Sequence, residues 1–139
     1  MRSKGYKGAG MDGLIACQYD KIARRYMAEL YRTWAQELSE GLAEDSRVLE
    51  IAPGPGYLAI ELAKRRNVRI TGLDVSENFV AIALGNAKRA GVDIDFQQGN
   101  ASFMPFENEK FDLLMCTSSF KNFSEPLEAL NEMYRVLKP

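Results

Sequence analysis

The chain has 139 residues, of which 46% are hydrophobic and 27% charged, a composition typical of one soluble globular domain. Its 18 basic and 19 acidic residues give a formal net charge of -1, which argues against nucleic acid or an anionic membrane as the main partner. It contains no histidine, so the commonest general base and metal ligand is missing, and we expect no metal site.

The N-terminal residues 1–12 carry positive charge with no apolar run behind them, which predicts a flexible tail rather than a signal peptide. No later apolar run is long enough to span a membrane. The two cysteines, Cys17 and Cys116, are isolated and show neither metal-site nor disulfide spacing. We therefore expect a cytoplasmic protein whose domain covers residues 13–139.

Residues 14–42 are helical in character, with apolar and aromatic side chains three and four positions apart. Ile22, Tyr26, Leu30 and Trp34 would form one stripe along this helical region, and Gly41 is a plausible end for it.

From Ser46 onward, strand and helix patterns alternate. Ser76 and Gly91 are expected to cap the two ends of one of the helices. The alternation predicts a doubly wound, mostly parallel α/β sheet of order 3-2-1-4 in a Rossmann-like fold, preceded by N-terminal helices. The expected strands are 47–52, 68–74, 93–99 and 111–116, and the expected helices are 56–66, 77–91 and one that begins near Pro126.

A glycine-containing loop follows the first strand, where Gly54, Gly56 and Ala59 fit the pattern G-x-G-x-x-G/A. Asp74 ends the second strand, and an acid about 20 residues beyond such glycines can bind the two ribose hydroxyls of an adenosine. The alternatives are a turn that needs glycine only for its backbone angles and an aspartate that only caps a helix. Together the loop and the acid favour an adenosine-containing ligand.

The residues around the glycines distinguish between adenosine ligands. Pro53 and Pro55 each remove a backbone N–H, and Glu50 adds a negative charge, which is unfavourable for a pyrophosphate. S-adenosylmethionine has no phosphate and carries a sulfonium and an ammonium, so a carboxylate suits it. Pairing of Glu50 with a nearby basic side chain is the structural alternative.

Several motifs carry a resemblance to a known family. "LEIAPGPG", "GLDVS", "FQQGNASFMPFENEKFDLLMC" and "EPLEALNEMYRVLKP" occur in the family order, and "YDKIARRY" resembles the opening helix of its small-molecule branch. On these motifs the chain resembles class I S-adenosylmethionine-dependent methyltransferases over nearly all of residues 19–139.

This resemblance implies a set of cofactor-binding residues. The methionine and sulfonium end would be lined by Glu50, Ala52, Gly54 and Gly56. Asp74 would bind the ribose, and Thr117 would lie near the methyl group. Adenine would contact Val75, Asn100 and Ala101, and Tyr19 could close over the cofactor.

Three departures from the family pattern stand out. Ala52 replaces a glycine, and Asn100 replaces an aspartate but can still accept a hydrogen bond. The family's fifth strand and antiparallel pair are not in this sequence, which leaves the fourth strand at an open edge. Either the chain is a fragment or a partner covers this edge, and for the chain alone we expect a homodimer.

The expected function is S-adenosylmethionine-dependent methyl transfer to a small-molecule acceptor, with S-adenosylhomocysteine as product. No side chain stands out as a catalytic base, and none is required when the acceptor is already nucleophilic. One alternative is a non-catalytic cofactor-binding or assembly module. The other is half of an NAD-dependent oxidoreductase domain, against which Glu50 and the prolines argue.

Overall fold

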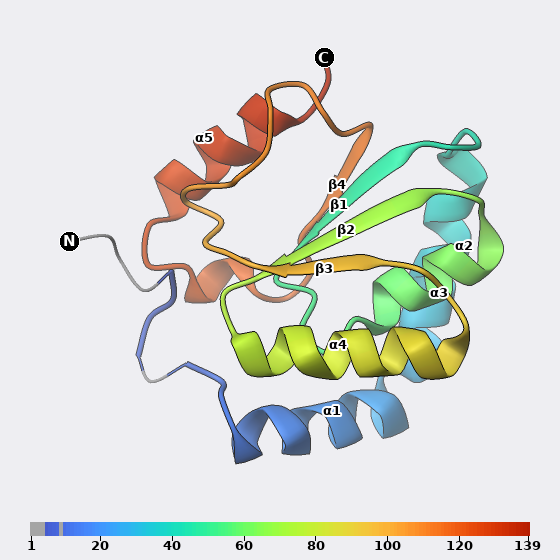
Figure 1. Ribbon diagram of the computed structural model, residues 1–139, viewed down its shortest axis with the longest axis vertical. Helices are drawn as coiled ribbons and strands as arrows, with labels where there is room; N and C mark the ends of the chain where they lie inside the picture. Colours follow the sequence, from blue (N-terminus) through green and yellow to red (C-terminus); the bar gives the residue numbers. More distant parts are fainter. Residues whose placement is uncertain (1–4, 9) are drawn as a thin grey trace.

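The computed structural model describes residues 5–8 and 10–139, so residues 1–4 and 9 of the predicted tail lie outside the described residues. Strands and helices alternate from β1 to β3, as predicted, and a segment without a helix then joins β3 to β4 (Figure 1). The elements are α1 (Leu14–Tyr26), α2 (Ala28–Gly41), β1 (Arg47–Ile51), α3 (Tyr57–Arg65), β2 (Arg69–Asp74), α4 (Glu77–Ala90), β3 (Asp95–Gln98), β4 (Leu113–Met115), the short 3-10 helix η1 (Phe120–Asn122) and α5 (Pro126–Val136).

The four strands form one parallel sheet in the order β3-β2-β1-β4, which confirms the predicted fold class and order. Helices α1 to α4 cover one face and α5 covers the other (Figure 1). Alternate strand residues enter the two cores: Val48 and Ile70 pack under α1 to α4, whereas Leu49 and Leu73 pack under α5. Burial on both faces explains why these strands are so apolar.

The N-terminal helical region contains two helices, because the backbone breaks at Met27. The prediction of one continuous stripe is therefore wrong. Trp34 packs at the margin of the core, whereas Ile22 and Tyr26 are 52% and 71% exposed. Helix α1 instead buries small residues, Ala16 and Ala23, and lies against α4.

The predicted caps of α4 are confirmed. The Ser76 hydroxyl accepts a hydrogen bond from the Phe79 N–H at 3.3 Å, and Gly91 ends the helix in a left-handed conformation with φ 70°. The N-terminus of α4 is thereby held directly beside Asp74, at the carboxyl end of β2.

The edge of the sheet at β4 is open, as predicted, but Phe111, just before β4, is paired with the C-terminal residues after α5. Phe111 donates its N–H to Val136 O at 3.0 Å and accepts from Lys138 N at 2.9 Å. Within the described residues, β4 itself is paired with β1 alone. The exposed pairing edge is therefore short.

Candidate functional site

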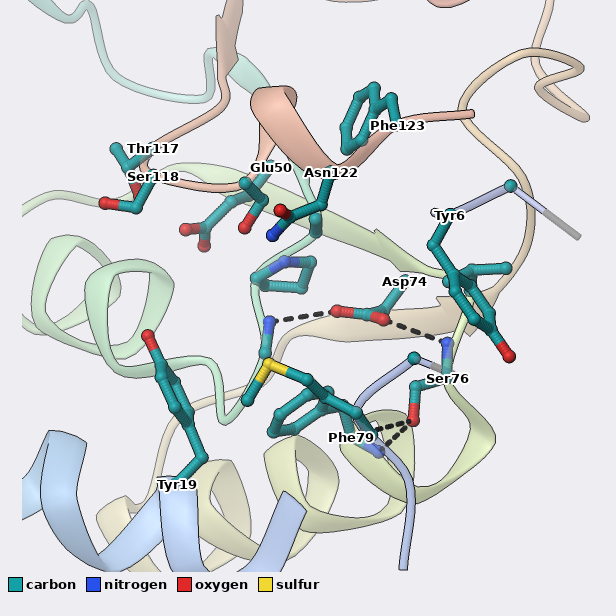
Figure 2. A pocket seen from close by; sticks show the side chains of 18 of the residues that line it. Tyr6, Tyr19, Glu50, Asp74, Ser76, Phe79, Thr117, Ser118, Asn122 and Phe123 are labelled. Atoms are coloured by element: carbon teal, nitrogen blue, oxygen red, sulfur yellow. Dashed lines mark hydrogen bonds between the residues drawn. The ribbon is translucent and has the colours of Figure 1, made fainter. Parts of the chain in front are cut away.

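A cavity of about 500 Å³ lies over the carboxyl ends of β1, β2 and β4, where the strand order reverses (Figure 2). Ligands of doubly wound sheets bind at this position. Its walls come from the N-terminal segment, α1, the turn after β1, the start of α4 and the residues after β4. The residues that line it include Tyr6, Met11, Asp12, Tyr19, Tyr31, Glu50, Ala52, Gly54, Asp74, Val75, Ser76, Phe79, Thr117, Ser118 and Phe123.

Asp74 is held rigidly at the cavity. Its Oδ2 accepts the Gly54 N–H at 3.0 Å and its Oδ1 accepts the Ser76 N–H at 2.9 Å (Figure 2). Burial raises the pKa of the Asp74 carboxyl above its ordinary value, although these N–H donors oppose the rise. Each oxygen keeps lone pairs for hydroxyl donors from a ligand.

Glu50 is a buried carboxylate at the end of β1, with only 2% of its surface exposed. Its Oε2 has no hydrogen-bond partner in the described part of the chain. Burial raises the pKa of Glu50 to about 8, a backbone hydrogen bond from Ala59 opposes the rise, and the charge of Asp74 adds to it. The predicted alternative, pairing with a basic side chain, is not seen among the described residues. A buried acceptor that faces a cavity and lacks a partner calls for a ligand that brings a donor or a positive charge.

The turn after β1 uses three left-handed residues, Ala52, Gly54 and Gly56, with φ 53°, 55° and 83°. At Gly54 an added Cβ would stay 3.9 Å from Phe79 and Tyr19, so this position faces open cavity. At Gly56 an added Cβ would come within 2.7 Å of Phe96 Cζ. Gly54 therefore keeps space for a ligand, whereas the missing side chain of Gly56 leaves room for the Phe96 ring of β3.

Alanine substitutions should separate these two roles. Gly56→Ala is expected to lower the free energy of unfolding by about 2–4 kcal/mol, because backbone strain and a clash with Phe96 add together. Gly54→Ala should lower it by only about 1 kcal/mol and should mainly weaken ligand binding. Urea denaturation of both variants measures the difference, and equal losses of stability would contradict the assignment.

The N-terminal segment lies along the cavity, a placement that the sequence did not indicate. Tyr6 forms an antiparallel bridge with Phe123, and the Lys7 N–H donates to Asn122 O at 2.8 Å. The Ser76 hydroxyl donates to Asp12 Oδ1 at 2.5 Å. Residues 5–8 and 10–12 thus run from the loop after β4 to the start of α4 (Figure 2).

The same segment also contacts the predicted adenine-binding residues. A Cβ built on Gly5 would lie 3.0 Å from Asn100 Cγ and 3.1 Å from Val75 Cγ2. The backbone of Gly5 therefore occupies the space between these two side chains.

Seven of the ten predicted site residues line the cavity: Tyr19, Glu50, Ala52, Gly54, Asp74, Val75 and Thr117. Gly56, Asn100 and Ala101 do not line it, and their roles stay predictions. Ser76 and Phe79 line the cavity as well and were not among the predicted site residues. Ser76 directly follows the "GLDV" motif and caps α4, and Phe79 lies in the first turn of that helix, so their positions could have indicated them. Tyr6, Met11 and Asp12 were not predicted either, because nothing local in a glycine-rich tail indicates that it folds back.

None of the helices in the described chain combines the length and apolarity needed to cross a bilayer.

A glycine turn after β1, an anchored acid at the end of β2 and an acid at the end of β1 whose Oε2 has no partner among the described residues lie together at the ligand-binding position of a Rossmann-like fold. Residues 48–139 match a family model described as "Methyltransferase domain". The chain belongs to the class I S-adenosylmethionine-dependent methyltransferases, which confirms the predicted family and its cofactor.

Named relatives and a solved structure agree with this membership. The chain is 34% identical to a demethylmenaquinone methyltransferase of Deinococcus radiodurans, over 99% of this chain and 58% of that protein. It is 31% identical to the ubiquinone/menaquinone biosynthesis C-methyltransferase UbiE of Bdellovibrio bacteriovorus, over 90% of this chain and 54% of that protein. A proposed S-adenosylmethionine-dependent methyltransferase from Methanococcus maripaludis superposes with a TM-score of 0.89 at 28% identity, covering 99% of this chain and 63% of that chain. The chain thus spans little more than half the length of these curated relatives.

Proposed function

We propose that this chain binds S-adenosylmethionine in the cavity over β1 and β2 and serves methyl transfer to a small-molecule acceptor. One observation carries the proposal: the buried Oε2 of Glu50 has no hydrogen-bond partner among the described residues. Glu50 and Asp74 line the same cavity. An ammonium or sulfonium beside Glu50 would supply the missing positive charge. Ribose hydroxyls would donate to Asp74, whose oxygens each already accept one N–H.

In this proposal the chain contributes binding, orientation and exclusion of water, while the bound cofactor supplies an electrophilic methyl group. Tyr19 and Thr117 line the cavity and would restrict where an acceptor can approach. We assign no catalytic base. Gly56, Asn100 and Ala101 are proposed to contribute to the site from outside the present cavity lining.

The acceptor that we propose is a quinone-type aromatic ring, methylated at carbon. The support is the names of the two relatives, a demethylmenaquinone methyltransferase and a ubiquinone/menaquinone biosynthesis C-methyltransferase. Apolar side chains at the cavity, among them Met11, Phe79 and Phe123, are compatible with such a ring.

Calorimetry with S-adenosylhomocysteine and with NAD tests the cofactor assignment. Binding of S-adenosylhomocysteine without binding of NAD is the expected result, and the reverse would overturn the proposal. Transfer of a labelled methyl group to demethylmenaquinone then tests the activity. Cofactor binding without transfer to any pooled quinone or other small acceptor would favour the non-catalytic module instead.

The N-terminal segment is expected to slow entry of the cofactor, because Gly5 lies between Val75 and Asn100. A chain that starts at Met11 should therefore associate with S-adenosylhomocysteine several-fold faster than the full chain. Stopped-flow fluorescence of Trp34 or of a fluorescent cofactor analogue measures the rate. Equal association rates in two samples with matching circular dichroism would show that the segment does not obstruct the site.

We further propose that the chain is cytoplasmic, and its two free cysteines support this location.

We also propose that the 139-residue chain forms a homodimer through the open edge of the sheet at β4. Light scattering at several concentrations should give a mass near twice 15.6 kDa. A monomer that does not change on dilution would contradict the dimer.

A further inference from the structure

A second cavity, of about 270 Å³, lies between α1, α2, α3 and α4, and Tyr31 forms a wall of both cavities. Four basic side chains line it, each from a different helix, and one carboxylate, Glu61, accompanies them. The basic residues are Arg24 on α1, Arg32 on α2, Lys64 on α3 and Arg89 on α4. This local excess of positive charge contrasts with the net charge of -1 for the whole chain.

Most of this positive charge is not neutralised. Lys64 is paired with Glu61 at 3.0 Å. Within residues 5–8 and 10–139, no carboxylate oxygen lies within 4.0 Å of the guanidinium groups of Arg24, Arg32 or Arg89. Three guanidinium groups from three helices therefore line one small cavity, and none of them forms an ion pair with a carboxylate of the described residues.

The polar groups at the inner side of the cavity are already satisfied. Tyr57 donates its hydroxyl to Asp20 Oδ1 at 2.6 Å, and burial raises the pKa of Tyr57 to about 12, so the phenol is neutral. Asn86, which is 5% exposed, donates to Asp20 Oδ1 at 3.0 Å and to Pro55 O at 2.9 Å. Arg89 donates one of its N–H groups to Asn86 Oδ1. Its remaining N–H groups and the guanidinium groups of Arg24 and Arg32 are the donors available to a ligand.

We propose that this cavity binds a phosphate group, with Arg24, Arg32 and Arg89 as its donors. Guanidinium groups match phosphate oxygens with paired N–H donors, and several converging on one anion bind it far better than one alone. The phosphate could belong to a soluble phosphate compound or to the headgroup of an anionic lipid, and the chemistry of recognition is the same. The proposal does not depend on the methyl-transfer function.

Two double variants with the same change in charge provide the test. Arg24→Gln with Arg89→Gln removes two cavity cations. Arg25→Gln with Lys88→Gln removes the neighbouring cations on the same helices, which do not line the cavity. All four side chains are exposed, so both variants should fold, and unchanged S-adenosylhomocysteine binding and circular dichroism confirm it.

Each protein is titrated with inorganic pyrophosphate by calorimetry and is floated with vesicles of phosphatidylglycerol or of phosphatidylcholine. The wild type and the Arg25/Lys88 control variant should bind pyrophosphate or phosphatidylglycerol vesicles with the same affinity. The Arg24/Arg89 variant should bind that same probe at least about tenfold more weakly. Selective loss of pyrophosphate binding indicates a soluble ligand, and selective loss of phosphatidylglycerol binding alone indicates a lipid headgroup. Absence of binding to both probes by the wild type, or equal losses in the two pairs, would overturn the proposal.

Discussion

Replacing Asp74 by alanine is expected to lower the affinity for S-adenosylhomocysteine at least about 100-fold, because two hydrogen bonds from ribose hydroxyls to a buried carboxylate would be lost. The substitution also leaves the N–H groups of Gly54 and Ser76 without their acceptor. We therefore expect a loss of about 1–3 kcal/mol in unfolding free energy as well. Calorimetry and urea denaturation of the same samples measure the two effects.

A milder variant separates binding from folding. Asp74→Asn keeps one oxygen acceptor and removes the charge, so its affinity should fall less than that of the alanine variant, by about tenfold. Asp95→Asn removes an exposed charge at the start of the neighbouring strand β3 and should leave the affinity unchanged. Unaltered affinity in a folded Asp74→Ala sample would remove the basis of the adenosine site.

Glu50→Gln is expected to stabilise the ligand-free protein at alkaline pH while weakening cofactor binding. The Glu50 pKa is raised from 4.5 to about 8, so the folded state keeps a proton that the unfolded state releases between these values. Wild-type stability should therefore fall as the pH rises through this window and level off above about pH 8. The glutamine variant lacks this loss, and its advantage should reach a few kcal/mol at pH 9 and nearly vanish at pH 4.5.

Urea denaturation at pH 4.5, 7 and 9, together with calorimetry of S-adenosylhomocysteine binding, checks both parts of this prediction. Affinity should fall about tenfold or more, because a charged partner of the ammonium is lost. Glu61→Gln on α3 is the control, and its effect on the free energy of unfolding should have the opposite sign. Hydrogen bonds from Arg65 and Lys64 outweigh the effect of burial there and lower the pKa of Glu61. A Glu50→Gln variant less stable than wild type at pH 9 would show that ionisation of the buried Glu50 carboxyl does not destabilise the folded state.

Much of the site was predictable because its signals are local. Asp74 ends a strand and Glu50 ends the preceding one, and parallel strands in the order β3-β2-β1-β4 bring both ends to one edge of the sheet. Proline and glycine mark the turn between them. The alternation of strand and helix patterns along the sequence was thus sufficient to predict that Glu50 and Asp74 lie close together.

Other features were not predictable, because they depend on contacts between distant segments. Gly56 matched a ligand-binding motif, yet its lack of a side chain is needed by Phe96 on β3. The stripe from Ile22 to Trp34 looked continuous, but the break at Met27 turned the two helices toward different neighbours. In both cases the packing partner lies outside the window in which a pattern can be recognised.

The sequence by itself determined the order of strands and helices, the caps of α4 and the two acids at neighbouring strand ends, because periodicity, glycine and proline act within a few residues of themselves. Only the tertiary structure decided that the N-terminal segment lies along the first cavity, that Glu50 Oε2 has no partner among the described residues, and that four helices each bring one cation to a second cavity. These features arise from residues far apart along the chain, and their energies depend on which side chains the fold leaves unpaired.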